Sequence, residues 1–342
     1  MNPSLTAIQR IVSVGWMAAV ALWVGPAIAA GAESDHSLDG QIWDAMIQLS
    51  GSNPGYRAEH AKGIVCQGTF TPSKDAATLS KAAHFQGGTI PVTVRFSDGP
   101  PDPFIADNSP DAGPRGMAIR FSLPGGQATD IESLSHNGFA VSTGEDFLAL
   151  LKAILATDRS KPHPWPIETF LASHPAAAKF VQENQAVPAS YGTVAYFSNN
   201  AFIFANAQGA RQAGRYKFLP VAGQRYLGEA DAKSKSQNFL GEELRARLQH
   251  GPVQVHMVVQ LANPEDPTND SSLVWPDDRR AVDVGVISIG SVVPDSDIAQ
   301  KALVFFPTDL SDGIELSDDP IPVLRTRVYA RSFARRQAAS EK

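Results

Sequence analysis

Residues 57–63 read Arg57-Ala58-Glu59-His60-Ala61-Lys62-Gly63 and lead directly into an apolar run that contains Val65 and Phe70. The apolar run predicts a β-strand, which places His60 where a loop enters a sheet. Histidine can ligate a metal or transfer a proton near neutral pH, and functional side chains are frequent on loops that a rigid scaffold positions. His60 is therefore the first candidate functional residue.

Similar runs recur along the chain. Alternating or β-branched residues predict strands at 63–70, 89–97, 116–122, 138–142, 194–205, 214–221, 253–261 and 282–292. Apolar residues at helical spacing predict helices at 38–50, at 144–158 and around 167–172. Helices do not follow each strand in turn, which disfavours a doubly wound parallel sheet. We expect an α+β fold, an antiparallel β-barrel with helices packed outside.

The composition limits the class of protein. The 342 residues are 43% hydrophobic and carry a formal net charge of −6, which supports a substantial core and disfavours a nucleic-acid partner. The single cysteine, Cys66, cannot form an intramolecular disulfide, and the chain contains no CxxCH motif. The lack of this motif excludes a c-type cytochrome, in which the cofactor is attached through thioether links.

The first thirty residues have the features of a secretory leader. Arg10 precedes an apolar stretch at 11–24, and Ala27-Ile28-Ala29 offers small residues at the spacing that a signal peptidase reads. The alternative is an uncleaved membrane anchor, because the apolar stretch extended to Ala30 approaches the ~20 residues that span a bilayer. Gly25-Pro26 favours cleavage. We expect a signal peptide at 1–29, one domain at 34–342, a periplasmic or otherwise exported protein, and no stable membrane insertion after cleavage.

Most of the other histidines have no partner at metal-binding spacing. Surface or capping roles are expected for His36, His84, His163, His174 and His250. His256 lies within an apolar strand segment, which indicates a hydrogen-bonded structural histidine.

Three residues near the C-terminus share one face of an expected helix. Arg325 and Tyr329 are four residues apart and Arg336 follows seven residues later, so at ~100° per residue all three point the same way. A basic helical face with one aromatic residue is often only a solvated surface. The other interpretation is a site in which a permanent cation stands beside a tyrosine.

Several segments resemble the haem-binding core of catalases, and they follow in the same order. They are residues 57–63, Val94-Arg95-Phe96-Ser97, 114–121, Asp130-Ile131, His136-Asn137-Gly138-Phe139, 191–193, 204–209, 216–218 and Val274-Trp275-Pro276. Together they cover most of the chain from Tyr56 to Arg336. In its extent the chain is similar to the catalase-related peroxidases, which are small exported members of the haem catalase family.

The resemblance implies that Tyr329 is the proximal ligand of a haem iron, with Arg325 one helical turn before it. A tyrosine has a pKa near ~10, so binding ferric iron as a phenolate needs the charge of the metal and a nearby cation. Phenolate ligation donates charge to the iron and stabilises its ferric and higher oxidation states. The propionates of heme b would be bound by Arg57, Arg95 and Arg336.

On the other side of the iron the resemblance places His60, which would act as general base and then as general acid on a hydroperoxide. Asn137 would position the peroxide by hydrogen bonding, and Ser97 would orient or tune the His60 ring. The implied reaction is the reduction of hydrogen peroxide or organic hydroperoxides by small organic electron donors, with weak catalase activity.

The chain departs from typical catalases at both ends. It stops soon after the tyrosine segment and lacks most of their N-terminal arm, so we expect no nucleotide site, a monomer or weak dimer, and a shell that admits small organic donors. One alternative is an enzyme that rearranges fatty-acid hydroperoxides. Another is a non-enzymatic barrel that carries haem or another apolar ligand, with His60 only structural. The presence of both His60 and Asn137 argues against a carrier, because transport needs neither an acid nor a base.

Overall fold

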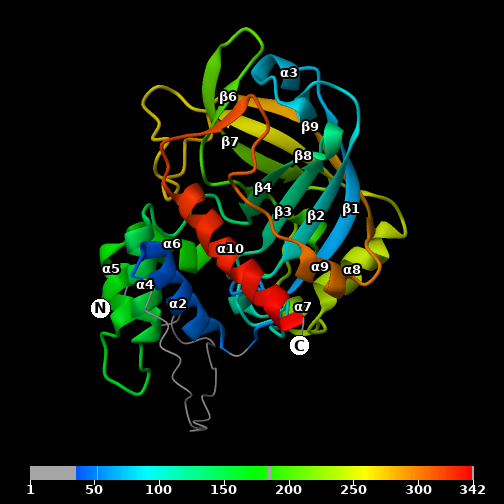
Figure 1. Ribbon diagram of the computed structural model, residues 1–342. Coiled ribbons are helices and arrows are strands. Elements are labelled where there is room, and N and C mark those ends of the chain that lie inside the picture. Colours follow the sequence, from blue (N-terminus) through cyan, green and yellow to red (C-terminus); the bar gives the residue numbers. More distant parts are fainter. Residues whose placement is uncertain (1–35, 52, 184–185, 341–342) are drawn as a thin grey trace.

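The computed structural model describes residues 36–51, 53–183 and 186–340 of the chain (Figure 1). The predicted signal peptide at 1–29 lies outside these residues. Among the helices that are described, none combines the length and the apolar character needed to cross a bilayer. The described part is built around one β-barrel, and most of the helices gather at its lower end in the view of Figure 1.

Eight strands of the described part close into the barrel, and every pairing between them is antiparallel. In order around the barrel they are β7 (Arg211–Pro220), β5 (Tyr196–Phe197), β4 (Ala128–Leu134), β3 (Gly116–Ser122), β2 (Ile90–Ser97), β1 (Gly63–Pro72), β9 (Ala281–Val292) and β8 (Val253–Leu261). The circle closes where β8 pairs with β7. Two short strands, β6 (Phe202–Ala205) and β10 (Ile314–Leu316), extend the sheet beyond β7. The expected antiparallel barrel with external helices is confirmed.

The main core fills the inside of this barrel. Val92, Val94 and Phe96 of β2 belong to it, and successive residues of a strand face opposite sides of the sheet. Arg95 and Ser97 therefore lie on the outer face of β2. Both side chains are nevertheless buried, because helices cover this part of the barrel.

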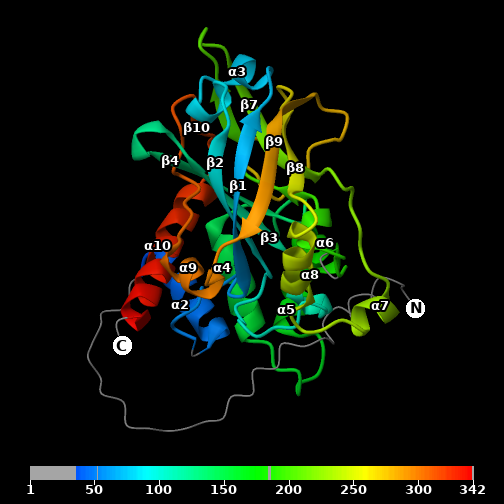
Figure 2. The same cartoon turned by 90° about the vertical axis from the view of Figure 1, so that its right-hand side faces the viewer.

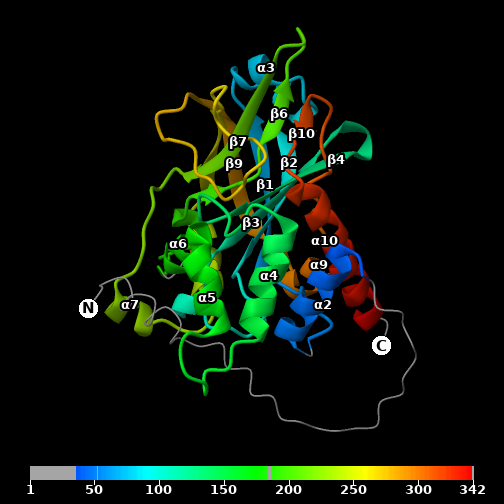
Figure 3. The ribbon, with the colours of Figure 1, turned by 90° about the vertical axis from the view of Figure 1, so that its left-hand side faces the viewer.

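The helical layer comprises α2 (Leu38–Ser50), α4 (Gly144–Leu155), α5 (Pro166–Ser173), α6 (Pro175–Glu183) and α10 (Ile321–Ser340). Figure 3 shows α4, α5 and α6 grouped beside α2, with α10 next to α2. One apolar cluster joins α2, α4 and α10 through Ile42, Leu151 and Val328, and another joins α4 to α6. The layer thus has cores of its own, separate from the barrel core.

Four further α-helices of the described part lie outside this layer. In Figure 2, α8 (Phe239–Leu248) lies next to the lower end of β9, and α9 (Ser296–Ala302) lies near the start of β1. The remaining two are α3 (Ala76–Leu79) and α7 (Glu229–Lys233). The sequence did not predict these four helices or α6.

Most predicted elements are present, and three of them, the helix at 38–50 and the strands at 116–122 and 253–261, have the predicted bounds. The segment 194–205 contains two short strands, β5 and β6, instead of one. The strand predicted at 138–142 is wrong. Gly138 has a φ of 110° and the backbone of Phe139 donates to the carbonyl of Ser271 at 2.8 Å, so this segment is a loop that follows β4.

His84 is also placed differently from the prediction, because it is buried rather than exposed. It lies in a 3-10 turn at Ala83–Phe85 whose rings pack into the main core against Phe121. Neither ring nitrogen has a hydrogen-bond partner among the described residues, and burial lowers the pKa of His84 to about 3. The small and polar residues before it suggested a surface position, whereas the turn inserts its aromatic end into the barrel core.

The other histidines agree with their predictions where the structure tests them. His36 and His250 are exposed, and His163 contacts Glu168 at the start of α5. The Nδ1 atom of His256 lies 2.7 Å from a carboxylate oxygen of Asp283, which confirms a hydrogen-bonded role.

Candidate active site

A cavity of about 570 Å³ lies between the outer face of β2, β3 and β4 and the helical layer. Its remaining walls come from α2, α4, α5, α6, α10 and several loops, including the loop before β1. The cavity brings together all but one of the predicted site residues: Arg57, His60, Arg95, Ser97, Arg325, Tyr329 and Arg336. Residues that are up to 279 positions apart in sequence therefore share one space.

Strand register arranges the barrel wall of this cavity in two rows across β2, β3 and β4. The rows are Ser97, Gly116 and Leu134, and then Arg95, Ala118 and Glu132. All of them line the cavity. Neighbours within a row lie on adjacent strands, which are ~4.8 Å apart, so Arg95 and Glu132 flank Ala118 on one face.

His60 enters the cavity from the loop before β1 with an unusual backbone. Its φ is 54°, a left-handed conformation that costs a non-glycine residue ~1–2 kcal/mol. The conformation is held by two hydrogen bonds: the His60 amide donates to the carbonyl of Gly99 at 2.8 Å, and Arg95 donates to the His60 carbonyl at 2.8 Å. The backbone is thus fixed at the residue that carries the candidate acid and base.

The ring of His60 is held by Ser97 and by the absence of a side chain at Gly116. The Ser97 hydroxyl lies 3.1 Å from Nδ1. A Cβ atom at Gly116 would lie 3.0 Å from Nδ1 and 2.5 Å from the Ser97 oxygen, too close for either. Burial, followed by the charge of Arg95, lowers the pKa of His60 to about 3, so the imidazole is neutral near pH 7 and can accept a proton.

Tyr329 faces the cavity from α10, and Arg325 lies one turn before it. The Nε of Arg325 donates to the Tyr329 hydroxyl at 3.0 Å, and its Nη1 donates to Oδ1 of Asn200 at 2.9 Å. Asn200 in turn donates to Asp319 at 2.8 Å, just before the helix begins. The guanidinium is therefore held in place beside the phenol oxygen, where it can stabilise a phenolate.

Arg57, Arg95 and Arg336 form a cluster that has no carboxylate partner among the described residues. Arg57 and Arg336 donate to backbone carbonyls, both of them to Leu303, and Arg95 donates to the side chain of Gln300. Burial lowers the pKa of each, and the neighbouring arginines lower that of Arg57 further. A buried cluster of like charges without counterions is unfavourable unless an anion binds there.

These features fit haem. The cavity offers an oxygen ligand for ferric iron at Tyr329, apolar walls for a flat ring, and buried cations for two carboxylates. A smaller pocket of about 80 Å³ is lined by Arg57 and Arg336 together with the exposed Lys301, so these two arginines lie between the main cavity and the surface. That position suits propionates, which remain partly hydrated.

Asn137 is the predicted site residue that is not among the described residues lining the cavity. It lies in the loop after β4, where the backbone of Gly138 donates to Asn199 at 2.8 Å, and Asn199 lines the cavity. The structure thus does not bring Asn137 together with His60 and Ser97 in the cavity wall.

Three carboxyl side chains line the cavity that sequence reasoning did not single out: Glu59, Asp111 and Glu132. Burial raises the pKa of Glu59 to about 8, and its carboxyl group has no hydrogen-bond partner among the described residues. The position of Glu59 directly before His60 could have identified Glu59 as a site residue from the sequence. The strand alternation around Ile131, which is in the barrel core, was the signal for Glu132.

A sequence model of the family described as Catalase matches residues 37–340. The chain belongs to the catalase family. Two curated proteins named catalase-related peroxidase are similar to this family member over most of both chains. The one from Mycolicibacterium paratuberculosis is 40% identical over 298 residues, which cover 85% of this chain and 92% of the relative. The one from Synechococcus elongatus is 32% identical over 300 residues, which cover 86% and 88%.

Solved catalase structures share the fold of this family member. A fungal catalase superposes with a TM-score of 0.73 at 20% identity, over 82% of this chain and 59% of that one. Catalase A from Saccharomyces cerevisiae gives a TM-score of 0.71 at 21% identity, over 82% and 61%. The chain therefore spans about three fifths of these larger catalases.

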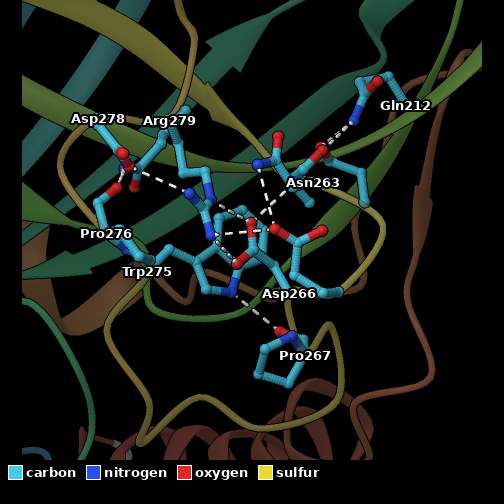
Figure 4. A network of polar contacts seen from close by, with 12 residues as sticks. Gln212, Asn263, Asp266, Pro267, Trp275, Pro276, Asp278 and Arg279 are labelled. Atoms are coloured by element: carbon cyan, nitrogen blue, oxygen red, sulfur yellow. Dashed lines mark hydrogen bonds and ion pairs between the residues drawn. The ribbon is translucent and has the colours of Figure 1, made fainter.

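The Val274-Trp275-Pro276 segment, which contributed to the catalase resemblance, has a structural role (Figure 4). Trp275 is buried, and its indole nitrogen donates to the carbonyl of Pro267 at 3.0 Å. Arg279 clamps the same loop by donating twice to Asp266, as Figure 4 shows. The loop carries Ser271, whose carbonyl holds the backbone of Phe139 at the cavity wall. This network thus supports the wall of the cavity.

Proposed function

We propose that this protein is a haem-dependent peroxidase that reduces hydrogen peroxide or organic hydroperoxides with small organic electron donors. The observation that carries the proposal is the shared cavity, in which a neutral His60 and an arginine-supported Tyr329 occur with a buried cluster of arginines. A carrier would need the arginines but not a histidine held in a strained backbone.

Membership of the catalase family makes the chain an oxidoreductase that acts on peroxide, and the family depends on haem. That the cofactor is heme b is part of our proposal, and the lack of a CxxCH motif supports it. When bound, the haem iron supplies the two-electron chemistry that cleaves the peroxide bond. Tyr329 would ligate this iron, and Arg57, Arg95 and Arg336 would bind the propionates.

His60 would move the peroxide proton. Its Nδ1 is engaged by Ser97, which leaves Nε2 as the nitrogen that can take the proton from one peroxide oxygen. The same nitrogen then returns the proton to the departing oxygen, which leaves as water or an alcohol. Because the pKa of His60 is lowered, its ring is unprotonated at neutral pH and can accept a proton. Ser97 would position the His60 ring through its contact with Nδ1.

The walls of the cavity support organic substrates. Leu150, Ile154 and Phe180 from the helical layer give it apolar surface, and the exposed Arg159 also lines it, so the cavity reaches the solvent there. Apolar walls that reach the solvent can bind a small phenol or an alkyl hydroperoxide. A site that reacts with hydrogen peroxide alone would need no such apolar surface. We therefore propose that catalase activity is weak relative to peroxidase activity.

The test is a comparison of purified holoprotein with His60→Ala. We expect a Soret band in both proteins, rapid oxidation of phenolic or azine dyes by the wild type, and a loss of ~10²–10⁴-fold in the variant. Slow release of oxygen from hydrogen peroxide should accompany dye oxidation. Unchanged turnover in His60→Ala, or no Soret band in protein from haem-sufficient cells, would refute the proposal. A lipid hydroperoxide that yields an epoxide instead of an alcohol would favour rearrangement.

We also propose that the protein is exported and acts as a monomer or weak dimer. The sequence of residues 1–29 supports export, since it has the basic, apolar and small-residue regions of a signal peptide. The mass of the protein recovered from the periplasm tests this proposal, because cleavage after Ala29 shortens the chain. An intact chain in the membrane fraction would support the anchor instead.

A further inference from the structure

Glu132 occupies a central place on the cavity wall for which neither acid–base chemistry nor propionate binding accounts. It lies on β4, in the row that contains Arg95 and Ala118, and its side chain is 12% exposed. Burying a carboxyl group is costly unless a cation or hydrogen-bond donors compensate. The contacts of Glu132 therefore indicate what it is for.

Its contact is Arg325, the cation beside the candidate iron ligand. One oxygen of Glu132 lies 3.5 Å from Nη2 of Arg325, while the other oxygen is buried without a hydrogen-bond partner among the described residues. The Nε of Arg325 donates to the Tyr329 hydroxyl at 3.0 Å. A single guanidinium thus stands between the phenol and the carboxyl group, and both acidic groups draw on its charge.

The surroundings leave the carboxyl group of Glu132 able to change its charge near neutral pH. Burial raises its pKa to about 7, the charge of Arg325 from α10 opposes the rise, and Asp130 and Asp309 add to it. Arg120 on β3 is near as well, but it donates to both oxygens of Asp130, at 2.8 and 2.6 Å. Arg325 is therefore the cation in contact with Glu132, whereas Arg120 is paired with Asp130 and interacts with Glu132 at longer range.

We propose that Glu132 is a positioning residue that acts through Arg325 on the Tyr329 phenolate and so sets how strongly Tyr329 donates charge to the haem iron. The inference rests on the proposed function, because it requires haem bound through Tyr329. A cation that serves only the phenolate withdraws charge from it, whereas a carboxylate on the other side of that cation offsets the withdrawal. The anionic form of Glu132 should then favour ferric iron.

The experiment measures the ferric/ferrous midpoint potential of the holoprotein by spectroelectrochemistry from pH 5.5 to pH 8.5. In Glu132→Gln at pH 8.5 we expect the reduction equilibrium to shift toward ferrous iron by about tenfold, which is about 59 mV for a one-electron couple. At pH 5.5 the two proteins should agree more closely, because the carboxyl group is then neutral in both. The wild type should show a step near neutral pH that Glu132→Gln lacks.

Two variants serve as controls. Asp309→Asn removes an exposed carboxylate that acts on Glu132 from outside the cavity lining, so the equilibrium should shift less than twofold. Glu59→Gln removes another buried carboxyl group of the cavity, and the step near neutral pH should persist in this variant. An equal shift in Asp309→Asn, or loss of the step in Glu59→Gln, would overturn the assignment to Glu132.

Failure of the inference is distinguishable from failure of the proposed function. Wild-type protein that binds no haem refutes the function. Two results would refute only the role of Glu132. In the first, the potential of the haem-loaded wild type does not vary across this pH range. In the second, Glu132→Gln has the same potential as the wild type at every pH. The wild-type measurement tests the inference even if Glu132→Gln does not fold or take up haem.

Discussion

At the scale of single residues, the cavity depends on positions where almost no other side chain fits. His60 adopts a positive φ because Gly99 and Arg95 hold its backbone, and its ring lies against Gly116, where a Cβ atom would collide with it. Such strain persists only where the surrounding structure compensates for it, which is common at reactive sites. The consequences can be measured with single substitutions.

Gly116→Ala should displace the His60 ring. The added methyl group would lie 2.5 Å from the Ser97 oxygen and 3.0 Å from Nδ1 of His60, so we expect peroxide reduction to fall by at least ~10-fold, a loss of ~1.4 kcal/mol of transition-state stabilisation. Stopped-flow kinetics of the haem-loaded variant measure this. Gly290→Ala on β9 is the matched control, since a Cβ there meets nothing within 4 Å. Similar rates in the two variants would contradict the packing argument.

Glu59 should make the stability of the apoprotein fall as the pH rises. Burial raises its pKa from an ordinary value of 4.5 to about 8, so between these values the folded chain binds more protons than the unfolded chain, and stability declines with increasing pH. Glu59→Gln should match the wild type near pH 5. At pH 8 it should be more stable by roughly 1–2 kcal/mol, less than the full shift implies because water enters the cavity. Urea unfolding at both pH values measures this, and an equal difference at both would count against it.

At the scale of elements, strands β2, β3 and β4 each serve two purposes. One face supplies the barrel core and the other supplies the cavity wall, because side chains alternate along a strand. Helix α10 likewise packs Val328 against α2 and α4 while it turns Arg325, Tyr329 and Arg336 toward the cavity. The chemistry is thus placed by elements that are themselves anchored in apolar cores.

A substitution in helix α10 should have opposite effects on the stability of the apoprotein and on haem binding. Arg336 is a buried cation without a carboxylate partner among the described residues, so Arg336→Gln should stabilise the apoprotein by about 1 kcal/mol and weaken haem binding by ~10-fold. Arg331→Gln on the same helix is the control. It removes an ion pair with Asp39 at 2.8 Å, so it should lower stability and leave haem affinity unchanged. Haem titration with thermal unfolding tests both, and unaltered affinity in Arg336→Gln would exclude a propionate role.

At the scale of the whole molecule, the barrel and the helical layer have separate apolar cores on either side of a cavity of about 570 Å³. A ligand that contacts both sides binds only when both are in place, so its binding energy couples their stabilities. Without it, the layer is held mainly by its two smaller clusters and by the contacts of its helices with one another.

Hydrogen exchange should reveal this coupling. In the apoprotein we expect amides of α4, α5, α6 and α10 to exchange at least ~10-fold faster than those of β1, β2 and β9, since local opening needs less energy where fewer apolar groups are buried. Haem should slow exchange in the layer most. Uniform protection of barrel and helices in the apoprotein would show that the molecule opens as one unit.

Local patterns in the sequence were enough to predict most of the elements and to select His60 and Tyr329 as candidate site residues. Alternation and helical spacing are local patterns, so they predicted β3, β8 and α2 with their bounds, and the segments around His60 and Tyr329 identified both as candidates. The prediction at 138–142 failed because the short apolar run of this segment does not reveal that Gly138 turns the chain with a positive φ. His84 was misplaced because the residues before it are polar or small, whereas its ring packs against Phe85 and Phe121 in the folded chain.

Which outward-facing side chains meet depends on how the elements pack against one another, and no local pattern shows it. Glu132 and Arg325 are 193 residues apart, and their contact depends on where α10 crosses the outer face of β4. The unpaired arginine cluster likewise exists because the loop before β1, strand β2 and helix α10 converge on one cavity. The physical reason is that local periodicity fixes which way a side chain points from its own element, whereas the packing of elements fixes what it meets.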